Sequence, residues 1–305
     1  INYNYPTAKY RERRKIEEQY RLHALGYLYY IQTVEGKRNI GLSSDDYRTN
    51  GGWPELLYIR EARRIDSGSY IDEMDIAESR SMIRPDSIGI GDYPMDSHAV
   101  QPKTDWTTGD LGEGEFYLPQ YTPWHQVPYS IMVPQGLDNC FTPTAVSATH
   151  VAYGTVRLEP VRMHFGQAAG TAAVFCVHMD MSASDVPVNQ IQEELLKSRT
   201  PIGNSGASIG IGGPGISQYP THLYMFSDLN TETQFRHEIQ WLAARGFYPC
   251  PAPQLRTPST VLNSQQFGPG EKLTKAELVT LLRHLNSRAE PDYPNVSASV
   301  WVKAL

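Results

Sequence analysis

Small residues dominate the stretch from Pro160 to Ala173, and this stretch limits the possible folds more than any other part of the chain. Apolar residues recur in it at three- and four-residue spacing, which is the period of a buried helix. Gly166 and Gly170 leave one helix face almost without side chains, so another backbone or a flat ligand can approach closely. We predict that the helix begins at Pro160, whose missing N–H would have no partner there. The predicted buried positions are Val161, Phe165, Ala168, Ala169, Ala172 and Ala173.

A polar stretch that contains His150 and Arg157 precedes this helix, and we interpret it as a turn. The N-terminus of a helix carries free backbone N–H groups and the positive end of the helix dipole. We therefore expect the helix start, just after Arg157 and Glu159, to favour an anion.

Two segments, SATHVAYGTVR at 147–157 and GQAAGTAA at 166–173, resemble the C-terminal signature of the FAD-dependent oxidoreductases. These are glutathione-reductase-like flavoproteins, distantly related to fumarate reductases. The resemblance spans roughly residues 10–200, because shorter matches follow in the same order and spacing. Those matches are YIREARRI at 58–65, DSI at 86–88, DYPMDSH at 92–98, VPY at 127–129 and VP at 133–134.

The resemblance implies an α/β fold, with the C-terminal half of a glutathione-reductase-like FAD domain and an α+β cap. It places a cap and substrate region at 1–130 and a flavin-contacting segment at 131–200, with FAD as the cofactor. The helix starting at Pro160 would point its N-terminus at the N1/C2 edge of the flavin. The positions implied at the cofactor are Arg60, Thr144, Ser147, Glu159, Pro160, Val161, Arg162 and Met163.

Catalytic roles at His150 and Arg157 are also implied by the resemblance. Distantly related enzymes use a histidine and an arginine in this region to hold a substrate carboxylate, and a guanidinium suits that geometry. The alternative is that Arg157 pairs structurally with Glu159 or Asp138.

His98 and Arg60 each have two interpretations. The resembled family has an Asp-x-His where His98 follows Asp96, so His98 either faces the flavin as a proton-transfer group or is a hydrogen-bonded structural residue. Arg60 clamps a carboxylate or a cofactor phosphate, or it forms an ion pair with a neighbouring carboxylate such as Glu61.

Local patterns predict the remaining elements of this region. Residues 8–34 form an amphipathic helix, and residues 80–130 form loops and short strands rich in Gly, Pro and Asp. Residues 131–146 are predicted to form a strand, a turn and a second strand. Residues 187–199 form another amphipathic helix. Where the family has a small-Gly-Arg step, this chain has Thr142-Pro143-Thr144.

The chain lacks a glycine fingerprint between a strand and a helix, which this family uses to bind the FAD pyrophosphate. A literal G-x-G-x-x-G lies at 210–215, but no strand pattern precedes it and Tyr219-Pro220 follows before any helix. We expect a companion chain or a cleaved fragment to carry the N-terminal FAD-binding half.

The composition changes after residue 200. Residues 201–218 resemble a glycine-rich linker, and 219–305 resemble a small all-α S-layer homology module whose second repeat is truncated. A capping box formed by Thr274 and Glu277 supports a helix there. This resemblance implies a cell-envelope or extracellular location, with a cell-wall polymer as a possible partner.

The charge, the hydropathy and the cysteine spacing of the chain argue against several classes of protein. A net charge of −6 argues against a nucleic-acid binder, no apolar run is long enough to span a bilayer, and three scattered cysteines lack metal-ligand spacing. The predicted function is FAD-dependent hydride transfer to or from a small organic substrate. The alternative is a non-catalytic cell-envelope protein that uses a relic flavoprotein scaffold.

Overall fold

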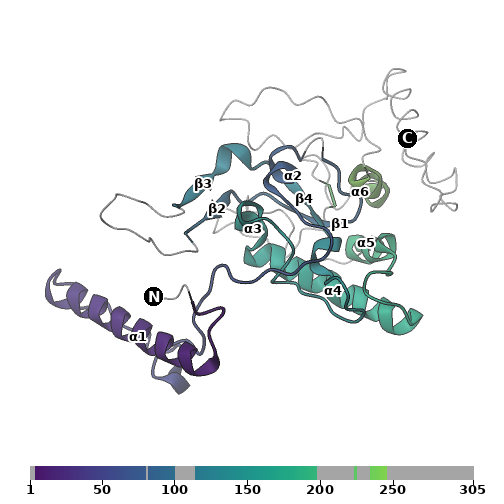
Figure 1. The fold of residues 1–305 in the computed structure, drawn as a ribbon. Coiled ribbons are helices and arrows are strands. Elements are labelled where there is room, and N and C mark those ends of the chain that lie inside the picture. Colours follow the sequence, from purple (N-terminus) through teal and green to yellow (C-terminus); the bar gives the residue numbers. More distant parts are fainter. Residues whose placement is uncertain (1–3, 80–81, 100–113, 198–222, 225–233, 246–305) are drawn as a thin grey trace, which may run out of the picture. The chain divides into compact units, whose positions relative to one another are not determined.

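The computed structural model describes residues 4–79, 82–99, 114–197, 223–224 and 234–245. The chain divides into two compact units (Figure 1). The first consists of Ile1–Arg63 and His98–Gly114, and the second consists of Arg64–Ser97 and Glu115–Leu305.

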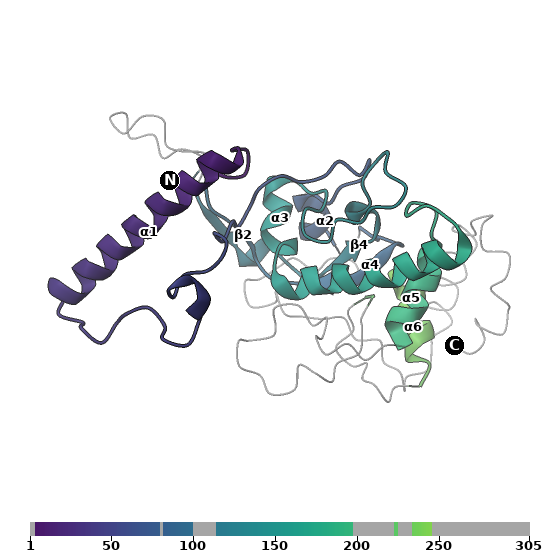
Figure 2. The ribbon, with the colours of Figure 1, turned by 90° about the horizontal axis from the view of Figure 1, so that it is seen from below.

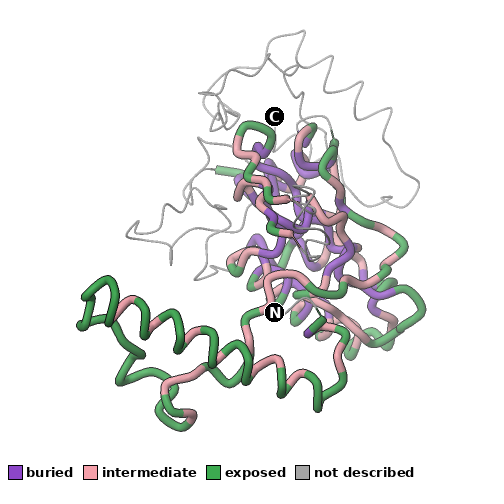
Figure 3. Tube along the Cα trace, turned by 60° about the vertical axis from the view of Figure 1, so that its left-hand side comes forward, coloured by how far each residue is buried: buried purple, intermediate pink, exposed green. Residues whose placement is uncertain are grey.

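The first unit contains one long helix, α1 (Tyr10–Thr33), and a short 3-10 helix, η1 (Arg48–Asn50). The predicted helix over 8–34 is therefore confirmed. None of its residues is buried (Figure 3), and Tyr27 on the predicted apolar face is 62% exposed. The charged residues that repeat along α1 favour helix and solvent contact, and an ion pair joins Lys15 to Glu12 one turn earlier.

The second unit contains two small antiparallel sheets, as the loop-rich composition of 80–130 predicted. Strand β1 (Ser87–Gly91) pairs with β4 (His125–Pro128), and β2 (Met95–Ser97) pairs with β3 (Phe116–Leu118). Both strands of the first sheet are buried along their whole length. Three short helical elements lie between or beside the strands: α2 (Glu73–Ala77), η2 (Pro119–Tyr121) and η3 (Ser130–Met132).

Helices α3 (His150–Val156), α4 (Glu159–Met179) and α5 (Val188–Lys197) complete the core of this unit. Helix α4 packs against β1 and α5 (Figure 2), and Phe165, Ala168 and Ala172 are fully buried. The predicted helix is thus confirmed and begins one residue earlier, at Glu159. This mixture of helices and small sheets agrees with the expected α/β class. Among the described residues, no helix is both long and apolar enough to cross a membrane.

Two local predictions are wrong. Residues 131–146 form no strand pair, because Pro134 and Pro143 have no N–H for a ladder. Only isolated backbone bonds tie this segment together, such as Thr142 N to the Met132 carbonyl at 2.9 Å. The expected turn at His150 is instead the helix α3.

The described part of the predicted C-terminal module consists of Leu223, Tyr224 and α6 (Arg236–Ala244). These residues pack into the second unit: α6 contacts α5, and the Tyr224 ring lies 4.7 Å from that of Trp124. These described residues of the C-terminal segment therefore pack against residues 64–197. The linker 201–218, the capping box of Thr274 and Glu277, and the second repeat lie outside the described residues.

Candidate active site

Helix α3 brings His150, Gly154 and Arg157 onto one face, because residues four and seven positions apart are in line on a helix. Gly154 lets the backbone of β2 approach this face. A Cβ added to Gly154 would lie 2.5 Å from the carbonyl oxygen of Asp96, so no larger residue fits there. The result is a polar cluster between α3 and β2.

His150 is oriented by two residues of the small β2–β3 sheet. Its Nε2 atom lies 3.0 Å from the Ser97 hydroxyl, and Ser97 is 1% exposed. The Phe116 ring meets the imidazole edge to face, with 6.2 Å between ring centroids. The half-buried imidazole is therefore held in a defined orientation.

Arg157 is 6% exposed and forms an ion pair with Asp96. Its Nη2 group donates to both the carbonyl and the Oδ2 of Asp96, each at 3.3 Å. Burial and the neighbouring Asp96 carboxylate raise the pKa of Tyr93. Breaking a buried pair by removing one partner is strongly destabilising. This geometry favours the structural alternative for Arg157, although the partner is Asp96 and neither Glu159 nor Asp138.

A second, cationic cluster surrounds the ring of Tyr153 near the start of α4. The Tyr153 hydroxyl donates to the Thr144 carbonyl at 2.7 Å, and Arg162 donates to that hydroxyl at 3.2 Å. The guanidinium of Arg64 lies 5.5 Å from the ring centroid. Thr144 is exposed, Arg64 and Arg162 are half-buried, and the Tyr153 ring between them is buried.

The N-terminus of α4 presents unused donors. No side chain caps it at Leu158, and the Nε of Arg162 is buried without a partner in the described part of the chain. A helix end with free N–H groups next to a guanidinium matches a group rich in hydrogen-bond acceptors. These donors can hold a group rich in acceptors, and the expected place of the flavin edge here stays a prediction.

The other expected cofactor positions differ in how they face solvent. Glu159 and Met163 are exposed in the first turn of α4, and Pro160 is half-buried. The Val161 side chain packs into the hydrophobic core, so it can meet a ligand only through its backbone. Ser147 is buried, and its N–H donates to the Ile131 carbonyl at 2.8 Å.

Arg60 and His98 belong to the first compact unit, whereas the cluster on α3 belongs to the second. Arg60 is half-buried in the extended chain after η1, and His98 is exposed. Their expected roles remain predictions.

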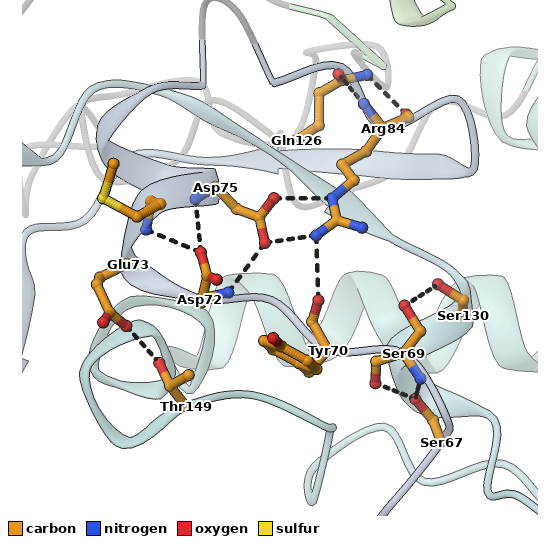
Figure 4. A network of polar contacts seen from close by, with 11 residues as sticks. Ser67, Ser69, Tyr70, Asp72, Glu73, Asp75, Arg84, Gln126, Ser130 and Thr149 are labelled. Carbon is orange, nitrogen blue, oxygen red and sulfur yellow. Dashed lines mark hydrogen bonds and ion pairs between the residues drawn. The ribbon is translucent and has the colours of Figure 1, made fainter.

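A polar network supports the start of α3 (Figure 4). Thr149 caps α3 by accepting from Ala152 N at 3.2 Å, and its hydroxyl donates to Glu73 Oε2 at 2.9 Å. Behind Glu73, a bidentate ion pair joins Asp75 to Arg84, with Nε to Oδ1 at 3.1 Å and Nη2 to Oδ2 at 2.5 Å. Because the network ties α2 to α3, it fixes the position of His150.

Sequence reasoning missed Ser97 and the pairing role of Asp96, although both lie in the quoted segment 92–98. The spacing His150-x₃-Gly154-x₂-Arg157 could have predicted the helix α3, because residues four and seven positions apart lie on one helix face. Within the described ranges, no group of His, Cys, Asp and Glu side chains is arranged to hold a metal ion.

Comparison with known proteins identifies the family. A family model described as FAD dependent oxidoreductase matches residues 1–195, which is more than half of the 305-residue chain. No curated protein and no solved structure matches it. The matched segment contains β2, α3 and the start of α4, and FAD is the cofactor of the family. The chain therefore belongs to the FAD-dependent oxidoreductases.

Proposed function

We propose that the protein transfers a hydride between FAD and a small organic substrate, with His150 as the proton-transfer group. The observation that carries this proposal is the oriented imidazole on α3, inside the segment that the family model matches. In oxidation, a substrate C–H bond breaks and its two electrons leave as hydride, while His150 accepts the proton from the neighbouring O–H or N–H. FAD, when bound, supplies the hydride acceptor.

The start of α4 has the donors to hold the flavin. The backbone N–H groups of Glu159 and Val161 and the Arg162 guanidinium would hold acceptor atoms of the flavin. In this proposal Arg157 holds β2 in place through its ion pair with Asp96. A substrate carboxylate would have to displace that internal carboxylate from a buried guanidinium.

Replacing His150 with glutamine is expected to slow flavin reduction by about 10²-fold or more, because general acid–base groups contribute that much. Glutamine keeps a polar side chain beside Ser97 but cannot take up a proton. The measurement is stopped-flow loss of flavin absorbance in the flavin-loaded protein, with a panel of small hydroxy acids, alcohols and amines. His178→Gln, at an exposed position in the last turn of α4, is the matched control. Equal rates in both variants would remove His150 from the mechanism.

The outward face of α4 supports a further part of the proposal, a companion that carries the pyrophosphate-binding half. Five exposed positions along this face, all apolar or glycine, form a stripe. A Cβ added at Gly166 or Gly170 would meet nothing within 4 Å. We propose that the companion chain or fragment packs on this stripe and contributes the glycine fingerprint that residues 1–305 lack. The stripe consists of Met163, Gly166, Gly170, Val174 and Val177.

The 305-residue chain expressed alone is expected to purify without stoichiometric flavin, and to gain it when the companion is coexpressed. Gly170→Arg should block this gain without unfolding the chain, because the added side chain enters open space. Ser184→Arg, at an exposed position beyond α4, is the control. The readouts are visible absorption and the melting temperature. Stoichiometric flavin on the chain alone would refute the companion.

A further inference from the structure

We propose that Tyr153 is a positioning residue for Arg162, because its hydroxyl holds the guanidinium in an orientation that leaves Nη1 available to acceptor atoms of FAD. This inference rests on the proposed role of Arg162 in holding the flavin. Its physical basis is a chain of two hydrogen bonds. Arg162 Nη2 donates to the Tyr153 hydroxyl at 3.2 Å, and that hydroxyl donates to the Thr144 carbonyl at 2.7 Å.

The direction of both hydrogen bonds is fixed by the chemistry of the groups. A guanidinium can only donate and a backbone carbonyl can only accept, so the phenol proton points at Thr144 and a lone pair of the phenol oxygen faces Arg162. The Tyr153 side chain is also held in place, because it is 4% exposed and the guanidinium of Arg64 lies 5.5 Å from its ring centroid. The hydroxyl is therefore an anchored acceptor for Arg162.

The half-buried Arg162 side chain has donors that the fold does not use. Its Nε is buried without a partner, and no carboxylate pairs with its guanidinium in the described part of the chain. Nη1 has no partner among these residues either, but it is not buried, so solvent and ligands can reach it. The guanidinium of Arg157, in contrast, is already paired with Asp96. Arg162 is thus the better placed of these two arginines to bind an incoming acceptor.

The position of Arg162 in α4 argues against a role in helix stability. Arg162 lies in the first turn, where the helix dipole disfavours a positive charge. The bond to Tyr153 therefore holds a cation where it does not strengthen the helix, and an acceptor-rich group of a ligand would offset that cost. We infer that the hydrogen bond serves binding.

The first test is the rotation of the Arg162 guanidinium about its Nε–Cζ bond, measured by NMR in the full chain labelled with ¹³C,¹⁵N-arginine and assigned with Arg162→Gln. A hydrogen bond at Nη2 slows this rotation, so we expect separate Nη1 and Nη2 signals in the native chain. In Tyr153→Phe, which removes only the hydroxyl, the two signals should merge.

Tyr129→Phe is the matched control. Tyr129 is 3% exposed, and its hydroxyl donates to the Ala183 carbonyl, also at 2.7 Å. The substitution therefore removes a similar buried hydrogen bond to a backbone carbonyl. It should leave the Arg162 signals as they are in the native chain.

The second test is a double-mutant cycle on the affinity for FAD, measured by flavin fluorescence as the flavin-loaded protein is diluted. Tyr153→Phe should weaken FAD binding by about tenfold, because the loss of a hydrogen bond to a charged group has an effect of that size. Tyr153→Phe combined with Arg162→Gln should bind FAD no more weakly than Arg162→Gln alone, because Tyr153 acts through Arg162. Tyr129→Phe should bind FAD like the native protein.

Two results would overturn the inference alone: merged Nη signals in the native chain, or effects of Tyr153→Phe and Arg162→Gln that multiply in the double variant. Neither would affect the proposed function as long as Arg162→Gln weakens FAD binding. An unchanged FAD affinity in Arg162→Gln would overturn the proposed flavin site together with the inference. The activity of His150→Gln tests hydride transfer separately.

Discussion

Truncation after Lys197 is expected to lower the free energy of unfolding of the second unit by roughly 5 kcal/mol or to prevent its folding. The family model ends at residue 195, yet Leu223 and Ala244 beyond it are buried in a small apolar cluster with Leu196. Leu223 and Tyr224 are 0% and 1% exposed, and burying two such side chains contributes about 3–6 kcal/mol in total.

Buried polar groups of the second unit also depend on the segment beyond Lys197. The Gln126 amide donates to the carbonyls of Leu223 and Ala244, at 3.2 and 3.1 Å. The Gln192 side-chain oxygen accepts from Arg245, whose guanidinium lies 3.7 Å from the ring centroid of Trp241. After truncation the Gln126 amide keeps its bonds to the Arg84 backbone, but the Gln192 side-chain oxygen loses Arg245, at a cost of about 1–3 kcal/mol if it stays buried.

Truncation after Arg245 is the matched control, because it keeps every one of these contacts. Urea denaturation followed by circular dichroism measures both truncated chains against the full chain. We expect the chain ending at Arg245 to unfold near the full-length midpoint and the chain ending at Lys197 to unfold well below it. Equal midpoints for the two truncated chains would show that residues 223–245 form a separate module, as the composition of the sequence suggested.

Acidification from pH 6.5 to 4 is expected to cost the second unit about 3 kcal/mol of stability through His164 alone. His164 lies in α4, is 4% exposed, and its Nε2 donates to the Ile88 carbonyl at 2.5 Å. Burial lowers its pKa from 6.5 to about 4. The folded state therefore binds fewer protons than the unfolded state between these values. The stabilisation is fully present above pH 6.5 and is lost as the pH falls toward 4.

His125 acts in the same direction. It is 0% exposed, burial lowers its pKa, and its Nε2 has no partner within the described part of the chain. Both histidines pack against glycines of β1: a Cβ added at Gly89 would collide with His164, and one added at Gly91 would lie 2.9 Å from His125 Nε2. The strand leaves no space for a hydrated imidazolium at either position.

His164→Gln separates this effect from the titration of surface carboxylates. Glutamine can still donate an N–H to Ile88 but has no charge to gain, so the loss of stability between pH 6.5 and 4 should shrink by about 3 kcal/mol relative to the native chain. The exposed His178→Gln should follow the native curve. If His164→Gln loses as much stability as the native chain, the buried imidazole does not control acid sensitivity. Urea denaturation at each pH provides the measurement.

The long helices could be predicted from the sequence because they satisfy local rules. Apolar spacing places the start of α4 within one residue and the bounds of α5 within two, with Ile191 and Leu195 fully buried in α5. The residue motifs also indicated the family and its cofactor, because ordered matches over nearly 200 residues are not produced by chance.

Short elements were harder to predict because a single helical turn is unstable without packing. Helix α3 has only seven residues, and it exists because Gly154 lets β2 lie against it and Thr149 caps its start. The segment over 131–146 has apolar residues like a strand, but its prolines prevent a ladder. Helix α1 shows that periodicity predicts a helix without predicting what covers its face.

The sequence by itself indicated the family, the cofactor and the main helices, and it singled out His150 and Arg157 as candidate site residues. Only the tertiary structure decided their partners. Ser97 lies 53 positions from His150, and Asp96 lies 61 positions from Arg157. No local pattern relates residues so distant, because the pairing of β2 with β3 and its close approach to Gly154 bring them together. In the folded chain the His150 imidazole is therefore held beside a buried hydroxyl, whereas Arg157 is already paired with an internal carboxylate.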